Sequence, residues 1–432
     1  MKTAIIGGGA AGFFLAVNLK EMMPEMEVTI FERGQHVLRK VAISGGGRCN
    51  CTNSFASVGD LSEVYPRGHR LMKRLFNVFD YRDAFQWFER HGVPLVTQDD
   101  DCVFPASQDS QSIVSCLLGN ARRLGVEILT GRKITSLDEL SDYDYIAVTT
   151  GGVPTPNRPN PQPLTEGKRP TPQPLPWREG SEMPLLAATP QAERVSTPLP
   201  RREGQGGGSL PCPSLFSFRI DDERLQALMG IVTEATAMIP GTKLKASGPL
   251  LITHWGMSGP AILRLSSYAA RLLYDNQYRL PLSVNWTNAK PDEVLQELYA
   301  IAAAHPQKQI ANIRPYGLTG RLWEYIIRKA LGNRSEGKWL SLNKKEMNRL
   351  SNMLTNDEYQ IDSRAPFKDE FVTCGGVSLQ SINPSTLESK THPRLYFAGE
   401  VLDVDGVTGG FNFQAAWTTA YVVAKSIAEK SF

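Results

Sequence analysis

The first thirty residues place short apolar runs on either side of a glycine-rich turn. Residues 3–6 are largely apolar, three glycines follow, and a second apolar run over residues 28–31 ends at Glu32. Continuous apolar runs of this length, bounded by a glycine turn, are typical of buried parallel strands. The pattern predicts strand, turn, helix and strand, the first βαβ unit of an α/β sheet.

The same alternation of elements continues to about residue 152. Apolar side chains recur mostly every three or four residues from Arg70 to His91, which predicts helix there, and a second helix is expected from Ser110 to Leu124. Strands are expected at residues 126–129 and 145–150, and two glycines follow the second.

Residues 153–210 interrupt the pattern. About half of the 29 prolines of the chain fall between this point and Pro213, and short proline-containing units recur almost unchanged. Such a composition buries too little apolar surface to offset the entropy lost on ordering. We therefore predict a disordered Pro/Gly-rich insertion, with a proline-motif docking site as the alternative.

Regular patterns return after the insertion. Alternating residues at 211–265, with a return at 356–365, predict a β-rich domain for substrate binding. Residues 266–355 are expected to be mainly helical, because apolar positions at 291–305, 322–331 and 343–354 have helical spacing.

The end of the chain resembles its beginning in pattern. An apolar strand ends in Gly399-Glu400, and the pair Gly409-Gly410 opens a helix that runs to Lys430. A glycine turn at a helix start offers free backbone amides to an anion. We therefore predict that residues 1–152 and 366–432 form one discontinuous domain.

Composition narrows the class of partner. The net charge of +3 over 432 residues gives no indication of a nucleic-acid partner or a membrane surface. No apolar run approaches the ~20 residues of a membrane span, and the N-terminus has the pattern of a strand rather than of a signal peptide. Six cysteines without a framework of pairs predict reduced thiols in the cytoplasm, and no metal site is expected from Cys49 and Cys51.

The glycine turn near the N-terminus has the spacing of a dinucleotide-binding site. Gly7, Gly9 and Gly12 fit G-x-G-x-x-G, and Glu32 follows Gly12 by 20 residues at the end of the second predicted strand. The first glycine allows the turn, the second lets the backbone approach a pyrophosphate, and the third lets helix and strand pack closely. A carboxylate at that distance can accept both hydroxyls of a ribose.

Three further segments, residues 40–53, 250–263 and 399–412, resemble a known family. The chain is similar to the BaiN-like, or aminoacetone-oxidase-like, bacterial FAD-dependent oxidoreductases, which are two-dinucleotide-binding flavoproteins. The resemblance spans nearly everything except residues 153–210. It implies an α/β fold, in which a discontinuous Rossmann-like FAD-binding domain holds an inserted β-rich domain and a small helical subdomain.

The resemblance also implies which residues contact FAD. They lie in the first glycine turn, at the end of the second strand, in the 40–50 segment and in the C-terminal segment, with a backbone contact from one residue after the 126–129 strand. These residues are Gly7, Gly9, Ala10, Ala11, Gly12, Glu32, Arg33, Lys40, Ser44, Gly45, Gly46, Gly47, Arg48, Cys49, Asn50, Ile134, Gly399, Glu400, Asp403, Gly409, Gly410, Phe411 and Asn412.

Two side chains have competing interpretations. Cys49 could exchange electrons with a flavin, but C-x-C would close a strained ring, so packing beside the cofactor is favoured. His254 is the candidate general acid or base, and an imidazole satisfied within a packed turn is the alternative.

The predicted function is an FAD-dependent oxidoreductase that transfers hydride between a small-molecule substrate, or NAD(P)H, and flavin N5. Since the chain has no second complete strand–G-x-G-x-x-G–helix unit, NAD(P)H would bind transiently in the substrate cleft. If an amine or another small molecule reduces the flavin instead, oxygen could be the electron acceptor. One alternative is a flavin-binding recognition or assembly protein with its redox state as a switch. Another is a damaged copy, because residues 153–210 stand where relatives have a short glycine-histidine element.

Overall fold

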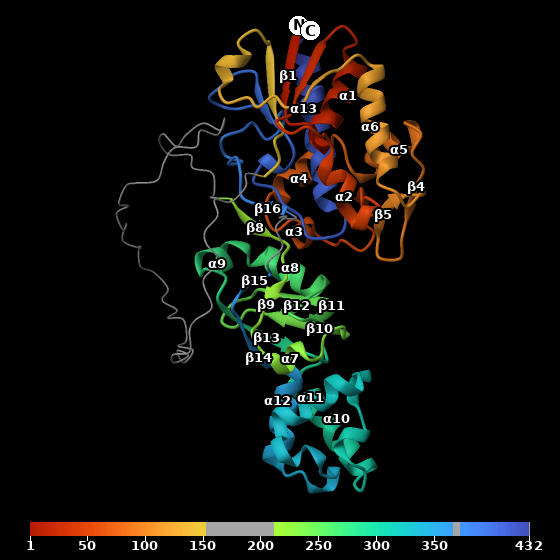
Figure 1. Cartoon of the computed structure of the whole chain (residues 1–432), viewed down its shortest axis with the longest axis vertical. Helices are drawn as coiled ribbons and strands as arrows, with labels where there is room; N and C mark the ends of the chain where they lie inside the picture. Colours follow the sequence, from red (N-terminus) through yellow and green to blue (C-terminus); the bar gives the residue numbers. More distant parts are fainter. Residues whose placement is uncertain (153–210, 366–371, 432) are drawn as a thin grey trace, which may run out of the picture. The chain divides into compact units, whose positions relative to one another are not determined.

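The structure, a computed structural model, describes residues 1–152, 211–365 and 372–431. The predicted disordered insertion, residues 153–210, lies outside them. Contacts within the chain divide the described residues into two units (Figure 1). Residues 1–152, 211–212 and 372–431 belong to the first unit, and residues 213–365 form the second.

A five-stranded parallel sheet forms the centre of the first unit. Its order is β17-β7-β1-β2-β6, so the first strand lies in the middle and a strand from the far end of the chain lies at one edge. The strands are β1 (Lys2–Ile6), β2 (Glu27–Phe31), β6 (Glu127–Leu129), β7 (Tyr145–Val148) and β17 (Leu395–Phe397). The expected α/β fold is confirmed.

Two helices from opposite ends of the chain pack together beside this sheet (Figure 1). They are α1 (Ala10–Met22) and α13 (Phe411–Lys430). Nine consecutive residues of α1, from Ala11 to Leu19, are buried, because the helix is apolar on nearly all its faces. Phe14 lies 5.1 Å from the Trp417 ring of α13, which ties the two ends of the chain into one core.

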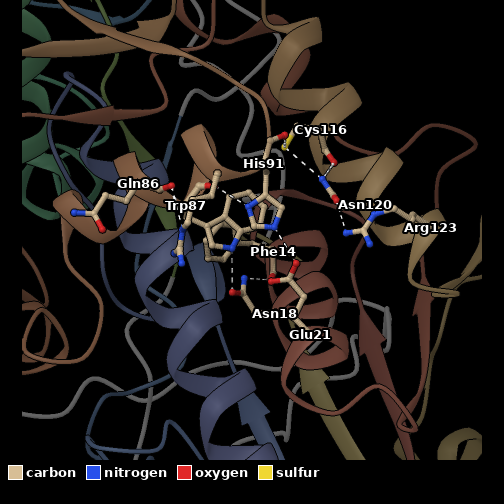
Figure 2. A network of polar contacts seen from close by, with 10 residues as sticks. Phe14, Asn18, Glu21, Gln86, Trp87, His91, Cys116, Asn120 and Arg123 are labelled. Carbon is tan, nitrogen blue, oxygen red and sulfur yellow. Dashed lines mark hydrogen bonds and ion pairs between the residues drawn. The ribbon is translucent and has the colours of Figure 1, made fainter.

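A polar network joins α1 to two further helices, α5 (Tyr81–Arg90) and α6 (Gln111–Arg123) (Figure 2). The Trp87 indole donates to Asn18 Oδ1 at 3.1 Å, and the His91 ring stacks on Trp87 at 3.8 Å. The two His91 ring nitrogens lie 2.7 Å from Trp87 O and 2.9 Å from Glu21 Oε1. The network fixes the helix that carries the glycine turn.

The predicted helix over Arg70–His91 is two helices, which corrects the expected single run. They are α4 (His69–Leu75) and α5, separated at residues 76–80. Asp80 breaks the run, since its side chain accepts from the amides of Arg82 and Asp83 and caps the second helix.

Shorter elements complete the first unit. A three-stranded antiparallel sheet has the order β3-β5-β4. Its strands and the remaining helices are β3 (Thr52–Asn53), β4 (Leu95–Thr97), β5 (Cys102–Pro105), α2 (Arg39–Gly47), α3 (Leu61–Val64), η1 (Leu137–Leu140) and η6 (Gly399–Val401). Outside these sheets, β8 (Cys212–Ser214) follows the undescribed segment and β16 (Val372–Cys374) begins the return of the chain to the first unit.

A seven-stranded antiparallel sheet forms the second unit, with the order β14-β13-β10-β11-β12-β9-β15. Its strands are β9 (Phe218–Arg219), β10 (Val232–Met238), β11 (Lys245–Thr253), β12 (Gly256–Ser258), β13 (Leu280–Asn285), β14 (Asp357–Ile361) and β15 (Ser363–Arg364). Its short helices are α7 (Glu223–Gln226), α8 (Pro260–Tyr268) and α9 (Ala270–Asp275). Pro260 occupies the first turn of α8, as its fixed φ favours.

A helical insertion, residues 286–356, connects the neighbouring strands β13 and β14 (Figure 1). The insertion shares one hydrophobic core with the sheet, from Phe216 to Ile361. β13 itself lies inside the 266–355 interval that we expected to be mainly helical. The helices of the insertion are α10 (Pro291–Ala304), α11 (Gly320–Leu331), α12 (Lys344–Thr355), η2 (Ile310–Asn312), η3 (Pro315–Gly317), η4 (Gly332–Glu336) and η5 (Trp339–Ser341).

Candidate functional site

The turn between β1 and α1 is shaped by its glycines. Gly7 has φ +122°, and a Cβ at this position would lie 2.5 Å from Thr149 O. A Cβ at Gly12 would overlap Gly7 O, whereas a Cβ at Gly9 would meet no atom within 4 Å. The turn therefore combines two close packing positions with one open position, at a helix start that no side chain caps.

Glu32 is held rigidly at the end of β2. Its Oε2 accepts from the Gly8 amide at 2.8 Å, and its Oε1 accepts from the Gly34 amide at 2.7 Å. Each carboxylate oxygen has a further lone pair, so the group can still accept from two hydroxyls. Arg33, the next predicted site residue, is exposed beside it.

The loop that contains Ile134 lies next to Glu32 and Gly34, at the end of β2. The amide of Arg132 donates to Glu32 O at 2.9 Å, and the amide of Gly131 donates to Gly34 O at 2.9 Å. Ile134 itself is buried. A cavity of about 570 Å³ opens beside the end of β2, between the loop 35–37, the edge strand β6 and α6.

The predicted phosphate-binding segment forms a chain of left-handed glycines at the end of α2. Gly45, Gly46 and Gly47 have φ of +57°, +68° and +86°, and Cβ atoms at the last two would meet nothing within 4 Å. Successive residues of this kind expose backbone amides in a concave nest that suits an anion. Arg48 stands next to it, with its guanidinium 4.3 Å from the centre of the Phe104 ring. The Ser44 hydroxyl donates to Val41 O at 2.8 Å.

Asn50 lies where the glycine segment 45–47 and the residues after it approach the turn before α13. Its Oδ1 is buried and has no hydrogen-bond partner, and it would lie 2.8 Å from a Cβ at Gly410. Asn53 Nδ2 donates to Gly409 O at 3.0 Å, and Trp417 Nε1 donates to Cys51 O at 2.8 Å. Residues more than 350 positions apart thus form one wall that contains an unsatisfied acceptor. Such an orphan atom is expected where a ligand completes the hydrogen bonding.

Glu400 lies opposite Lys40. The Lys40 ammonium is 2.7 Å from Glu400 Oε2, and Glu400 Oε1 accepts from the Thr373 amide at 2.8 Å. A Cβ at Gly399 would lie 2.8 Å from the Ala11 Cβ, which places η6 at the start of α1. The two predicted halves of the site, near the N-terminus and the C-terminus, therefore meet in this unit.

The turn before α13 is built by its own side chains. Asn412 Oδ1 accepts from the Gly406 amide at 2.8 Å, and its Nδ2 donates to Gly406 O at 2.9 Å. Phe411 is buried, with its ring 5.1 Å from Phe55. Asp403, two residues before Asp405, donates its amide to Val377 O at 3.1 Å.

Sequence reasoning missed one pair in this region. The buried Asp405 carboxylate binds the Arg67 guanidinium through both of its oxygens, and the contact of Nε with Oδ1 is 2.5 Å. The pair anchors the 399–410 segment to the chain before α4. Asp405 lies inside a segment that the sequence singled out, but no pattern marks Arg67.

The two cysteines of the C-x-C element are buried thiols. Burial raises the pKa of Cys49 to about 12 and holds the pKa of Cys51 well above its usual range. Both groups are therefore thiols at neutral pH, which disfavours nucleophilic or redox chemistry and favours the packing interpretation of Cys49.

His254 lies in the second unit, in the turn between β11 and β12. Its side chain is exposed, and its ring is 4.2 Å from the Trp255 ring. Within the described residues no three His, Cys, Asp or Glu side chains gather as a metal site, and no helix there is long and apolar enough to cross a bilayer.

Comparisons with known proteins match both units. The family model described as the HI0933-like protein Rossmann domain matches residues 1–155, and the one described as the HI0933-like protein barrel and H2TH domain matches residues 212–372. The chain is 29% identical to a ribosomal RNA dihydrouridine synthase of Escherichia coli, over 99% of this chain and 98% of that protein.

Two other relatives also match along nearly their whole length. A ribosomal RNA dihydrouridine synthase of Haemophilus influenzae is 27% identical over 99% of this chain and 98% of its own. A 3-dehydro-bile acid delta(4,6)-reductase of Clostridium scindens is 24% identical over 99% of both chains.

Proposed function

The chain belongs to the HI0933-like family of two-dinucleotide-binding flavoproteins, and on this premise we propose that it is an FAD-dependent reductase of carbon–carbon double bonds conjugated to a carbonyl. We propose a uridine of ribosomal RNA as its substrate. The family resemblance inferred from the sequence, to BaiN-like flavoproteins, is confirmed.

The residues present fit FAD. The open position at Gly9, the glycine nest at residues 45–47 and the orphaned Asn50 oxygen each leave room or hydrogen-bonding capacity for a ligand. The amides at the start of α1 would hold the pyrophosphate, and Glu32 would hold the adenosine ribose. When bound, FAD supplies two-electron chemistry at flavin N5.

The proposed class of reaction follows from the activities for which the relatives are named. A dihydrouridine synthase saturates the uracil C5–C6 double bond, which is conjugated to a carbonyl, and a delta(4,6)-reductase acts on double bonds conjugated to a 3-keto group. Both reactions add a hydride to one carbon and a proton to the other. A chain with the same full-length organisation supports the same class of reduction here.

The observation that carries the choice of RNA is the end-to-end match to two ribosomal RNA dihydrouridine synthases. Their identities of 29% and 27% exceed the 24% of the bile acid reductase. This proposal differs from our expectation, drawn from net charge alone, that no nucleic acid is a partner.

NAD(P)H is the proposed source of electrons. The sequence contains no second complete strand–G-x-G-x-x-G–helix unit, so NAD(P)H would bind transiently and leave before the substrate enters. His254 is our candidate for the group that delivers the proton, because an imidazole can act as a general acid.

Product analysis tests the proposal. The purified protein is incubated anaerobically with NADPH and with an unmodified transcript of ribosomal RNA. The RNA is then digested to nucleosides, whose masses are measured by mass spectrometry. We expect uridine to gain two hydrogens in the RNA. Absence of dihydrouridine from every RNA offered, with the flavin reduced by NADPH, would refute the RNA assignment.

A second candidate substrate is a small cyclic enone, which the full-length match to the bile acid reductase favours. A steroid 4,6-dien-3-one offered in the same assay separates the two. Turnover of the steroid without turnover of RNA would keep the reaction class and change the substrate.

A further inference from the structure

The positive charge of the chain is concentrated in its helical insertion. Residues 286–355 contain eleven Lys and Arg against six Asp and Glu, a net charge of +5, whereas the whole chain has a net charge of +3. The other 362 residues together are therefore slightly acidic. A charge excess confined to one small subdomain calls for a local explanation.

Part of this excess lies on two paired segments between the helices. Residues 306–310 and 337–340 run side by side, joined by backbone hydrogen bonds such as Trp339 N to Lys308 O at 3.1 Å. They display Lys308 and Lys338, both exposed. The Trp339 ring stacks on Trp323 at 6.4 Å, so the segments rest on the core of the insertion.

Two more lysines follow directly along the chain. Lys344 and Lys345 are exposed at the start of α12, a few residues after the paired segments. We call Lys308, Lys338, Lys344 and Lys345 the basic patch. None of the four forms an ion pair within the described residues, and Lys338 donates only to the neutral side chain of Gln307, at 3.1 Å.

Two acidic residues lie close to these lysines in the sequence, Glu336, which is exposed, and Glu346. Glu346 pairs with Arg334 at 2.9 Å and caps α12 through the Asn343 amide. Leu340, within the paired segments, is 67% exposed. The paired segments and the start of α12 thus expose four lysines without an ion pair to any described residue, and the exposed apolar Leu340 lies between Lys338 and Lys344 in the sequence.

The positions of Lys344 and Lys345 are unfavourable for the fold itself. The N-terminus of a helix carries partial positive charge, so cations in the first turn weaken the helix. Neutral polar residues at these two positions would keep the helix surface equally well solvated. Their presence is better explained by a negatively charged partner than by stability.

We infer that the basic patch binds the phosphate backbone of the RNA substrate. This inference rests on the proposed function, which supplies a polyanion of the right kind. Lysine ammoniums bind phosphates as point charges and read no sequence. The patch therefore contributes affinity for large RNA, while the choice of uridine belongs to the flavin site.

The test compares two quadruple variants as full-length holoproteins. The patch variant is K308Q/K338Q/K344Q/K345Q, and the matched control is K73Q/K243Q/K245Q/K425Q, which removes four exposed lysines elsewhere. Binding to deproteinised ribosomal RNA is measured across a salt series. We expect the patch variant to bind at least about tenfold more weakly near 0.1 M salt, with a salt slope smaller by roughly 3, and the control to change much less.

Further readouts separate this inference from the proposed function. The patch variant should reduce its flavin with NADPH, and turn over uridine in a dinucleotide, at the wild-type rate. Unchanged RNA binding by a folded patch variant would overturn the inference, even if RNA uridines are reduced. If RNA binding depends on the patch but no dihydrouridine is formed, the inference that the patch binds RNA is supported and the proposed function is refuted.

If the quadruple variant does not fold, the double variant K344Q/K345Q replaces it. The double variant should reduce the salt slope by about half as much as is expected of the quadruple variant. Preferential binding of the patch to an acidic polypeptide such as poly-glutamate, with no salt-dependent binding of RNA, would also overturn the inference.

Discussion

At the scale of single residues, the sequence predicted those positions whose role is fixed by backbone geometry. G-x-G-x-x-G demands glycine for steric reasons, and the overlaps that a Cβ would make at Gly7 and Gly12 show those reasons in the fold. Arg67 could not be predicted, because an arginine becomes special only through the buried Asp405 that it meets 338 residues away.

Gly12 gives a direct test of this steric account. Gly12→Ala should reduce stability by about 1–3 kcal/mol and lower FAD occupancy, because its Cβ would overlap Gly7 O. Gly119→Ala in α6 is the control, since its Cβ would meet nothing within 4 Å, and it should be neutral or stabilising by about 0.5–1 kcal/mol. Denaturant unfolding and flavin content measure both. Equal behaviour of the two variants would contradict the account.

His254 remains a prediction that kinetics can test. If its imidazole delivers the proton, His254→Asn should slow reduction of the substrate by about 10²–10⁴-fold while reduction of the flavin by NADPH is unchanged. His392→Asn, another exposed histidine, serves as the control. Loss of both half-reactions in His254→Asn would indicate a structural role within the turn.

At the scale of elements, the pattern of apolar residues predicted the longer helices and the strands of the parallel sheet, and local chemistry set their ends. The apolar spacing over Arg70–His91 was continuous, but Asp80 caps a new helix within it. β13 was missed, since its buried run lies between helical segments and its partner β14 is over seventy residues further on. Pairings of that range leave no periodic signal in the sequence.

The start of α12 offers a prediction about stability. K344Q/K345Q should raise the free energy of unfolding by about 0.3–1 kcal/mol per lysine, because it removes two cations from a helix N-terminus. Chemical denaturation at low salt measures the change, and the gain should shrink at high salt. A decrease in stability would show that the two lysines serve the fold.

At the scale of the whole molecule, glycine turns at both ends of the sequence predicted one α/β unit built from the two ends of the chain. The parallel pairing of β17 with β7 has the arrangement that such a unit requires. The expectation of no nucleic-acid partner used the net charge of +3 alone, and that value averages an insertion of +5 with a slightly acidic remainder. The proposed contact with RNA rests on the distribution of charge rather than on its sum.

The most direct measurement of the central claim is the visible absorption of the purified protein under anaerobic conditions. We predict flavin bands that bleach on addition of one equivalent of NADPH per flavin and return when excess unmodified ribosomal RNA is added, because the RNA uridine accepts the two electrons and no NADPH remains to reduce the flavin again. Flavin bands that bleach and stay bleached with RNA would contradict the substrate. A colourless protein that takes up no FAD would contradict the account as a whole.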